Sequence, residues 1–293
     1  MKDNTMKWLL FISLSFIWGS SFILMKGGLA HLTSTQVASI RIIVSGLVLL
    51  PITIKTFSLL PKNKIFPIFL SGVLGSLLPA YLFCVAEEKI DSSLAGTLNS
   101  LTPIFVIISG AVFFKTSTSA NKVAGILIAF VGCALLFYNQ SVFSESAHFS
   151  YILLIVLATF CYGVNVQLVH HHLANISSIQ IVSLALSLSA IPSMALLIYS
   201  GYFSLNFHDF GLLASTGYSF LLGIVGTSLA SVLFYKLIKK AGAIFSSMVT
   251  YGIPFVAILW GVFLGEKIGL NQILCLLLIL IGVFIANKKV STD

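Results

Sequence analysis

The side chains that could bind a metal ion or transfer protons are few in this sequence, and their spacing suits neither task. His170, His171 and His172 are consecutive. Three successive helical positions point in different directions, so we expect a solvated loop rather than a metal site there. The four cysteines lie in apolar segments at unrelated spacings, as small core residues do. No Asp, Glu or His lies in the middle of an apolar segment, so the sequence predicts no enzyme, no metal and no cofactor.

A short polar interruption near the N-terminus is a better candidate for binding a solute. Trp18, Ser20 and Ser21 break an apolar run that continues to Met25. Because the run continues, this stretch belongs to a retained helix rather than to a signal-peptide cleavage site. Either these small residues let two helices approach closely, or they face a cavity.

Arg41 is the only arginine of the chain and lies within an apolar segment. Six residues past Thr35, it sits about 9 Å along its helix, short of the bilayer midplane at roughly 15 Å. A charge at this depth costs a few kcal/mol unless it is paired or solvated. Arg41 therefore either reaches the outer interface or sets a positive field at the outer mouth of a cavity, where it attracts anionic groups.

Two prolines, Pro103 and Pro254, fall in the middle of predicted helices at matching positions. A proline removes a backbone donor and frees the carbonyl one turn earlier. Asn99 and Tyr251 lie just before the two prolines. Either neighbouring hydroxyls satisfy two structural kinks, or the loosened turns present polar groups to a solute.

The candidates for lining such a cavity are aromatic, polar or proline residues inside apolar segments. They are Trp18, Ser20, Ser21, Arg41, Tyr81, Asn99, Pro103, Tyr162, Asn165, Tyr251, Pro254 and Trp260. Helix packing or lipid contact is the alternative interpretation for Trp18, Ser20, Ser21, Tyr81, Tyr162, Asn165, Tyr251 and Trp260.

These residues must be positioned by membrane-spanning helices. Of 293 residues, 58% are hydrophobic and 8% are charged, with a mean hydropathy of +1.07, whereas soluble domains have about 25% charged residues. The predicted fold class is therefore an all-α integral membrane protein with ten transmembrane helices, each near the roughly 20 residues that cross a bilayer. The ten apolar runs are 7–29, 35–57, 64–86, 92–114, 120–139, 150–169, 178–200, 211–236, 243–265 and 269–287.

Positive charges orient these helices. With the N-terminus inside, the inner side holds all of the 16 Lys and Arg residues except Lys26, Arg41, Lys89 and Lys267. This bias predicts a multi-pass membrane protein with both termini in the cytoplasm. The net charge of +8 is not arranged as a basic stripe with interleaved aromatic residues, so nucleic acid is not an expected partner.

The sequence is also weakly similar to itself, which divides it into two halves, 1–143 and 144–293. Each half contains five predicted helices. Because five is odd, we expect the second half to enter the membrane from the opposite side, as in carriers built from inverted repeats. Shifts of 144 to 151 residues align Trp18 with Tyr162, Gln36 with Gln180, Gly72 with Gly223, Gly75 with Gly226, and Pro103 with Pro254.

Four segments resemble the EamA family of the drug/metabolite transporter superfamily: IWGSSFILMKGGL, ASIRIIVSGLVLL, SLAGTLNSLTPIFVIISGAVFF and YGIPFVAILWGVFLGEKIGLNQILCLLLILIGV. The resemblance covers nearly the whole chain, in the same order and twice over. It implies a ten-helix carrier of the inner membrane with a central cavity between the halves. Such a carrier moves amino acids or other small metabolites, often outward. We expect a monomer whose partners are a small-molecule substrate and the lipid bilayer.

The resemblance also narrows the solute. Small multidrug resistance relatives carry a membrane-embedded glutamate in the first helix, where this chain has Trp18 to Phe22, so export of lipophilic cations by that chemistry is not expected. A nucleotide-sugar or other organic-anion carrier is the alternative, but it would need more cavity cations than Arg41 and Lys26 supply. A membrane assembly protein without transport is a further alternative, which leaves the repeat with its paired prolines unexplained.

Overall fold

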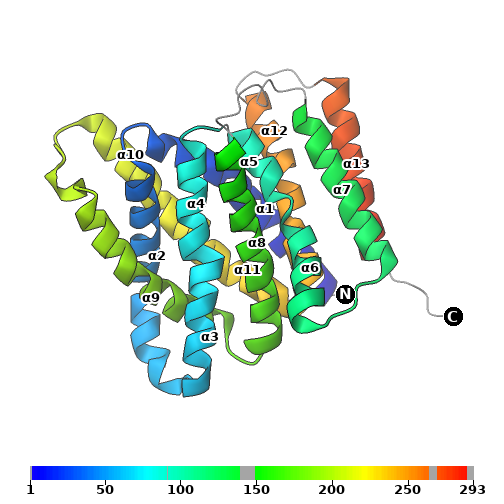
Figure 1. Cartoon of the computed structure of the whole chain (residues 1–293), viewed down its shortest axis with the longest axis horizontal. Coiled ribbons are helices and arrows are strands. Elements are labelled where there is room, and N and C mark those ends of the chain that lie inside the picture. The colour runs from blue at the N-terminus through cyan, green and yellow to red at the C-terminus, as the bar shows by residue number, and fades with distance from the viewer. Residues whose placement is uncertain (1, 91, 139–148, 264–268, 289–293) are drawn as a thin grey trace.

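The computed structural model describes residues 2–90, 92–138, 149–263 and 269–288, and these residues form helices, turns and short connections (Figure 1). Eight helical segments are long and apolar enough to cross a membrane. Many large apolar side chains lie exposed on the outside, among them Ile54, Phe66, Val112 and Phe284, as a lipid-facing surface requires. The predicted all-α membrane class is confirmed.

The helices follow the chain in two series. The first series is α1 (Lys2–Leu29), α2 (Ser34–Thr56), α3 (Lys62–Gly72), α4 (Leu78–Glu87), α5 (Ser92–Asn99), α6 (Thr102–Phe114) and α7 (Ala120–Tyr138). The second series is α8 (Phe149–His172), α9 (Ser178–Tyr199), α10 (Phe210–Leu221), α11 (Ala230–Ser247), α12 (Ile253–Phe263) and α13 (Leu270–Asn287).

Two helices begin with the same local device. At the start of α2, the Gln36 side chain accepts from the backbone N–H of Thr33, and Thr33 Oγ1 accepts from the backbone N–H of Gln36. A capping box of this kind also begins α9, where Gln180 accepts from the Ser177 backbone. The box satisfies backbone donors that a helix start leaves unpaired. The aligned glutamines thus mark equivalent helix starts.

Two π-helical segments widen the helical chain at aligned positions. Val73–Leu77 joins α3 to α4, and Leu222–Leu229 joins α10 to α11. The shift of 151 residues carries 73–77 onto 224–228, inside the second segment. A π-helical turn leaves carbonyl groups out of the regular hydrogen-bond ladder and is often found at functional sites.

The two prolines do not lie in the middle of continuous helices, which corrects the prediction. Pro103 lies in the first turn of α6, after a turn that separates it from α5. Pro254 lies in the first turn of α12, after the 3₁₀ segment Met248–Gly252. Proline suits a first turn because no helical hydrogen bond needs its missing N–H. Each proline therefore starts a helix after a break.

The expected spans 211–236 and 243–265 are not separated by an ordinary loop. Helical structure runs from Phe210 to Trp260 over 51 residues and is interrupted at Gly242, whose φ of 82° and ψ of 168° are not helical. Glycine adopts such a positive φ at little cost. Within the described residues, Ala120–Leu135 is an apolar helix shorter than a full span. The count of ten helices and the inverted arrangement stay predictions.

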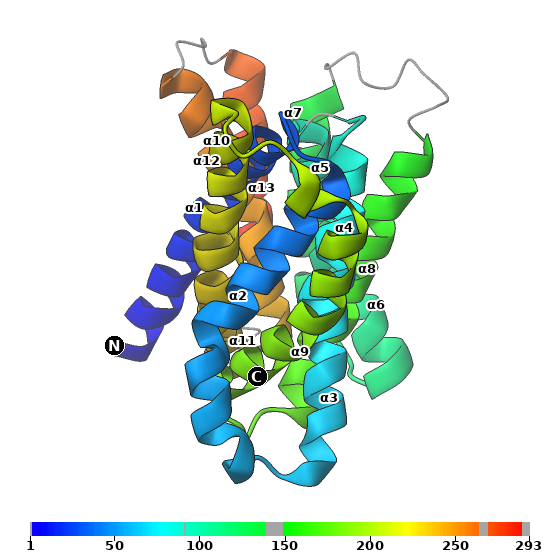
Figure 2. The same cartoon turned by 90° about the vertical axis from the view of Figure 1, so that its left-hand side faces the viewer.

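Helices from the two series pack in pairs. α2 lies along α9, α7 along α13, α6 against α8, and α1 against α12 (Figures 1 and 2). Gly125 and Gly282 bring α7 and α13 very close, because a Cβ atom at Gly125 would lie 2.4 Å from the backbone N of Ala286. Small residues permit such close approach in membranes.

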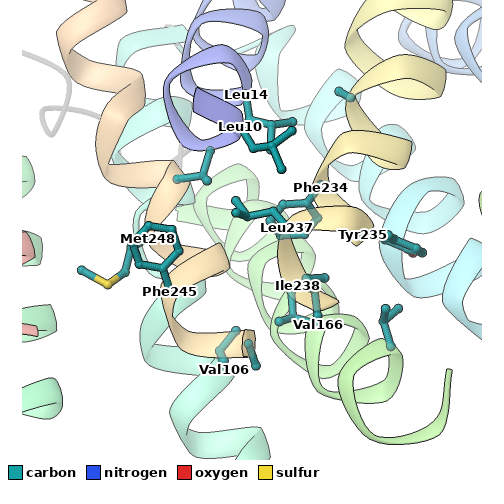
Figure 3. Packing of buried hydrophobic residues seen from close by; sticks show 14 of the residues in the cluster. Leu10, Leu14, Val106, Val166, Phe234, Tyr235, Leu237, Ile238, Phe245 and Met248 are labelled. Carbon is teal, nitrogen blue, oxygen red and sulfur yellow. The ribbon is translucent and has the colours of Figure 1, made fainter. Parts of the chain in front are cut away.

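A buried apolar cluster lies where α1, α6, α8 and α11 meet (Figure 3). Leu14, Val106, Val166, Leu237 and Ile238 are at most 1% exposed there. Because the four helices belong to both series, this cluster fixes the two halves of the chain against each other. It thereby positions the polar cavity described next.

Candidate functional site

A central cavity lies between the two series of helices. Together with its mouth and the open space in front of it, it contains about 880 Å³ free of protein atoms. Its walls are aromatic, hydroxyl and amide side chains with one cation. The lining residues are Trp18, Ser21, Phe22, Met25, Arg41, Gly75, Ser76, Phe83, Asn99, Thr102, Tyr162, Asn165, Val166, Gly226, Thr227, Ser231, Phe234, Tyr235, Ser247 and Thr250.

Arg41 is held at the cavity by the second π-helical segment. Its Nε donates to Thr227 Oγ1 over 2.6 Å, and Thr227 Oγ1 donates to the Leu222 carbonyl at 3.3 Å. Five residues separate Leu222 from Thr227, so the bond closes within the widened turn. Among the described residues, no carboxylate forms an ion pair with Arg41. The guanidinium is thus held through its Nε atom beside the cavity that it lines.

Trp18 bridges α1 to the same π-helical segment. Its Nε1 donates to the Gly226 carbonyl at 3.2 Å, and its ring meets Phe234 edge-on with centroids 4.9 Å apart. Gly226 also lets Ser21 of α1 lie close to this segment, since a Cβ atom there would lie 2.7 Å from Ser21 Oγ. Trp18 therefore presents a fixed aromatic face to the cavity.

Asn165 and Tyr235 form the corresponding polar contact at the first π-helical segment. Asn165 Nδ2 donates to the Tyr235 hydroxyl at 3.0 Å, and Tyr235 donates to the Ser71 carbonyl at 3.5 Å. A Cβ atom at Gly75 would lie 2.3 Å from Asn165 Nδ2. The amide is thus packed directly onto the backbone of this segment.

The break before Pro103 turns Asn99 towards the cavity. Thr102 Oγ1 donates to the Asn99 carbonyl at 2.8 Å, which satisfies an acceptor that the interrupted helix leaves free. Tyr162 also lines the cavity, and its ring stacks on Phe83 with the ring centroids 6.1 Å apart. Of the predicted candidates, Trp18, Ser21, Arg41, Asn99, Tyr162 and Asn165 line the cavity.

The other candidates lie outside the lining and connect helices. Trp260 Nε1 donates to Ser20 Oγ at 2.9 Å and so ties α12 to α1. Tyr251 is fully buried, and its hydroxyl donates to the Ile126 carbonyl of α7 at 2.8 Å. The Tyr81 hydroxyl shares a 2.7 Å hydrogen bond with Ser39.

Pro103 and Pro254, as helix starts, also do not line the cavity. The three histidines form the last turn of α8 rather than a loop, because the helix continues to His172. No group of three metal-binding side chains occurs within the described ranges.

Several lining residues were not predicted, and most belong to the π-helical segments or to α11. Among them are Ser76, Thr227, Ser231, Phe234 and Tyr235. A sequence signal for them exists: the aligned glycine pairs at 72/223 and 75/226 lie within or directly before the two π-helical segments. The glycine spacing alone does not predict that the helix widens into a π-helical turn at these positions.

Comparisons with known proteins agree over almost the whole chain. The model of the EamA-like transporter family matches residues 5–138 and 149–288. An uncharacterized transporter of Archaeoglobus fulgidus is 28% identical over 287 residues, which cover 97% of this chain and 99% of the relative. The uncharacterized transporter YdfC of Bacillus subtilis is 30% identical over 162 residues, which cover 55% of this chain and 52% of the relative.

A solved structure has the same fold. It superposes with a TM-score of 0.73 at 12% identity, and the match covers 96% of this chain and 98% of that one. At this identity the similarity concerns the fold alone.

Proposed function

The chain belongs to the EamA-like transporter family, and on this premise we propose that it is a secondary carrier that binds a small carboxylate-bearing metabolite in the central cavity. Amino acids are the first candidates. The carrier would export its solute by alternating access. Export is the proposed direction because the family resemblance of the sequence implies it.

The charge of the cavity is the observation that carries this proposal. Arg41 is the one charged side chain among the described residues that line it. A single guanidinium in a partly desolvated site favours one anionic group and disfavours cations. A nucleotide sugar carries more negative charge than one guanidinium can match, so the organic-anion alternative is less well supported.

The remaining walls suit an amphipathic solute. Trp18, Phe83 and Phe234 offer apolar faces, whereas Ser231 and Thr250 offer hydroxyls. Pockets with apolar walls and a few directed polar groups are typical of small-molecule sites. We infer a solute whose carboxylate lies at Arg41 and whose side chain lies against the aromatic rings.

Alternating access is supported by how the two halves, 1–143 and 144–293, meet at the cavity. Ser21 of the first half lies against Gly226, and Asn165 of the second half lies against Gly75. Each contact is the counterpart of the other under the sequence shifts. Inverted repeats of five helices each would produce such an exchange and allow the halves to rock about a central site. We propose this arrangement for the chain.

We further propose a monomer in the bacterial inner membrane with both termini in the cytoplasm. The lysine distribution supports this orientation. A reporter enzyme that is active only in the periplasm, fused after Asp293, tests it. Reporter activity would refute the orientation.

Transport assays with matched variants test the carrier. Proteoliposomes are loaded with a mixture of amino acids and other small carboxylates, and the loss of each solute is followed by mass spectrometry. Hydrogen bonds to charged groups contribute about 1.5–3 kcal/mol, so Arg41→Gln should raise the KM for the transported carboxylate roughly 10- to 100-fold. Lys26→Gln is the control, because Lys26 is an exposed cation of α1 outside the lining.

Two results would decide against this proposal at different levels. An unchanged KM in folded Arg41→Gln protein would refute the carboxylate assignment and leave the carrier intact. Absence of protein-dependent loss for every solute tested, with uncharged metabolites included in the mixture, would refute the carrier itself.

A further inference from the structure

A second cavity opens at the end of the molecule where the N-terminus and the ends of α6, α8 and α13 come together. With its mouth it contains about 1440 Å³ of space free of protein atoms. The cationic, imidazole and hydroxyl groups that line it are those of Lys7, Lys122, Lys288, His170, His171 and residues 116–119. We name it the basic pocket.

The charges of the basic pocket converge from separate elements. Lys7 belongs to α1, Lys122 to α7, and Lys288 follows the end of α13. No Asp or Glu within the described ranges lines the pocket. A concave surface with charges of one sign focuses its field and concentrates counter-ions. The pocket therefore selects an anion.

Other lysines of the same end of the molecule are arranged differently. Lys55 and Lys62 are exposed beside the α2–α3 connection and line neither cavity. Lys64 donates to the His172 carbonyl at 3.0 Å. The positive-inside bias explains lysines of this kind, but it does not require three of them to line one pocket.

Four hydroxyl side chains in succession also line the basic pocket and suit it to an anion. Residues 116–119 read Thr-Ser-Thr-Ser and form an irregular connection between α6 and α7. The chain is turned into this connection by Lys115, which has a φ of 52°, and by the hydrogen bond from Thr116 N to the Gly110 carbonyl at 2.9 Å. Hydroxyl groups that lie beside ammonium groups donate hydrogen bonds to phosphate oxygens, and they help to desolvate the phosphate.

Two of the lining groups are held in place by aromatic contacts. Lys7 Nζ lies 5.1 Å from the centre of the Phe245 ring. The His171 ring stacks on Phe114 at 4.9 Å with an angle of 14° between the planes. Groups that are fixed before binding lose less conformational entropy when a ligand arrives.

We propose that the basic pocket binds a phosphate group, carried by an anionic phospholipid of the adjacent leaflet or by a phosphate in solution. The outward faces of α7 and α13 expose Leu127, Leu280 and Phe284, and these would contact the acyl chains of a lipid. The ligand connects α1, α7, α8 and the end of α13. This site is distinct from the central cavity and does not depend on the solute carried there.

Binding is tested on the full chain in a neutral detergent. The protein is titrated with short-chain phosphatidylglycerol, with short-chain phosphatidylcholine and with inorganic phosphate, and the midpoint of thermal unfolding, Tm, is followed. A ligand that binds the folded state raises Tm with its concentration. Native mass spectrometry of the same samples counts bound lipid.

The test variant is Lys122→Gln/Lys288→Gln, and Lys55→Gln/Lys62→Gln is the control with the same change in charge. Each lysine near an anionic lipid is worth about fivefold in affinity, so the test variant should bind phosphatidylglycerol roughly 25-fold more weakly. The control should bind like the wild type. Each variant is compared with its own Tm without ligand, so a change in basal stability does not imitate lost binding.

The arms separate the two sources of phosphate. Pocket-dependent stabilisation by phosphatidylglycerol alone assigns a lipid, and pocket-dependent stabilisation by inorganic phosphate assigns a soluble ligand. If neither probe stabilises the wild type more than the Lys122→Gln/Lys288→Gln variant, the basic pocket is not a phosphate site.

Discussion

The second helix of each half packs against the other half beside a π-helical segment, at Gly223 within Leu222–Leu229 and at Gly72, the last residue of α3 before Val73–Leu77. A Cβ atom at Gly223 would lie 2.7 Å from the carbonyl oxygen of Arg41, and one at Gly72 would lie 2.7 Å from the carbonyl oxygen of Ala185. The shifts of 151 and 144 residues pair these glycines and these carbonyls. The two backbone contacts are therefore equivalent.

The side chains at those contacts are not equivalent. Where the first half has Arg41, the second has Ala185, and where the first has Trp18, the second has Tyr162. A shared backbone contact is what a rocking motion between two halves requires. Because of these unequal side chains, the cavity has one cation among the described residues, Arg41, although the backbone contacts beside it occur once in each half. In the proposed mechanism, the backbone symmetry would serve movement between the halves, and the side-chain asymmetry would serve recognition of the solute.

The largest effect should come from adding a methyl group at each of the two glycines that form these close contacts. Gly72→Ala and Gly223→Ala each place a methyl group 2.7 Å from backbone oxygen, where no flexible side chain can yield. Overpacking of this kind costs about 1–3 kcal/mol, so both variants should unfold at lower temperature and lose most of their transport. Calorimetry and the proteoliposome assay measure the two effects.

Gly217→Ala is the control for these variants, because a Cβ atom there would meet nothing within 4 Å. It should behave like the wild type. The comparison between the halves predicts losses of similar size for Gly72→Ala and Gly223→Ala. A severe loss for one of them and none for the other would show that only one contact supports the fold.

Much of this symmetry could be predicted from the sequence, because it depends on glycine. The pairs at 72/223 and 75/226 are visible as spacing; the first marks a close approach to backbone oxygen atoms and the second a close approach to polar side chains. Side-chain direction could not be predicted in the same way. The helix with Trp18 and Ser20 is apolar on all sides, so periodicity does not distinguish the side that faces the cavity from the side that faces α12.

The prolines illustrate a second limit. Their matched positions predicted two weak points in the helices, and breaks do occur before Pro103 and Pro254. Whether a proline kinks a helix or begins a new one depends on the preceding residues and their packing. Tyr251 does not line the cavity, and its hydroxyl donates instead to the Ile126 carbonyl. Local sequence does not predict this tertiary contact.

A smaller effect should follow from releasing the guanidinium. Thr227→Val removes the oxygen that accepts from Arg41 Nε while keeping the side-chain shape. Losing one orienting bond to a charged group should raise the KM for a carboxylate solute about tenfold. Ser76→Ala changes the position that the shift of 151 pairs with Thr227, so it removes the hydroxyl from the π-helical segment that contacts α9, where Ala185 takes the place of Arg41.

If Arg41 makes the two sides of the cavity unequal, Ser76→Ala should change the KM for the carboxylate solute less than twofold. Equal effects of Thr227→Val and Ser76→Ala would mean that the two hydroxyls act on the solute alike. The role of Thr227 in holding Arg41 would then be refuted.

The smallest effect distinguishes the paired aromatic residues. Trp18→Phe keeps an aromatic ring but leaves the Gly226 carbonyl without the donor that reaches it at 3.2 Å, which should cost about 1 kcal/mol of stability. Tyr162→Phe keeps the ring that stacks on Phe83 and should leave Tm nearly unchanged. Trp18 joins α1 to the other half through a hydrogen bond, whereas the ring contact of Tyr162 does not depend on its hydroxyl. The two conservative changes should therefore shift Tm by different amounts, although the sequence shift makes the two positions equivalent. Equal Tm shifts for the two variants would show that the aromatic pair is symmetric in energy as well as in position, and the asymmetry would then be confined to Arg41.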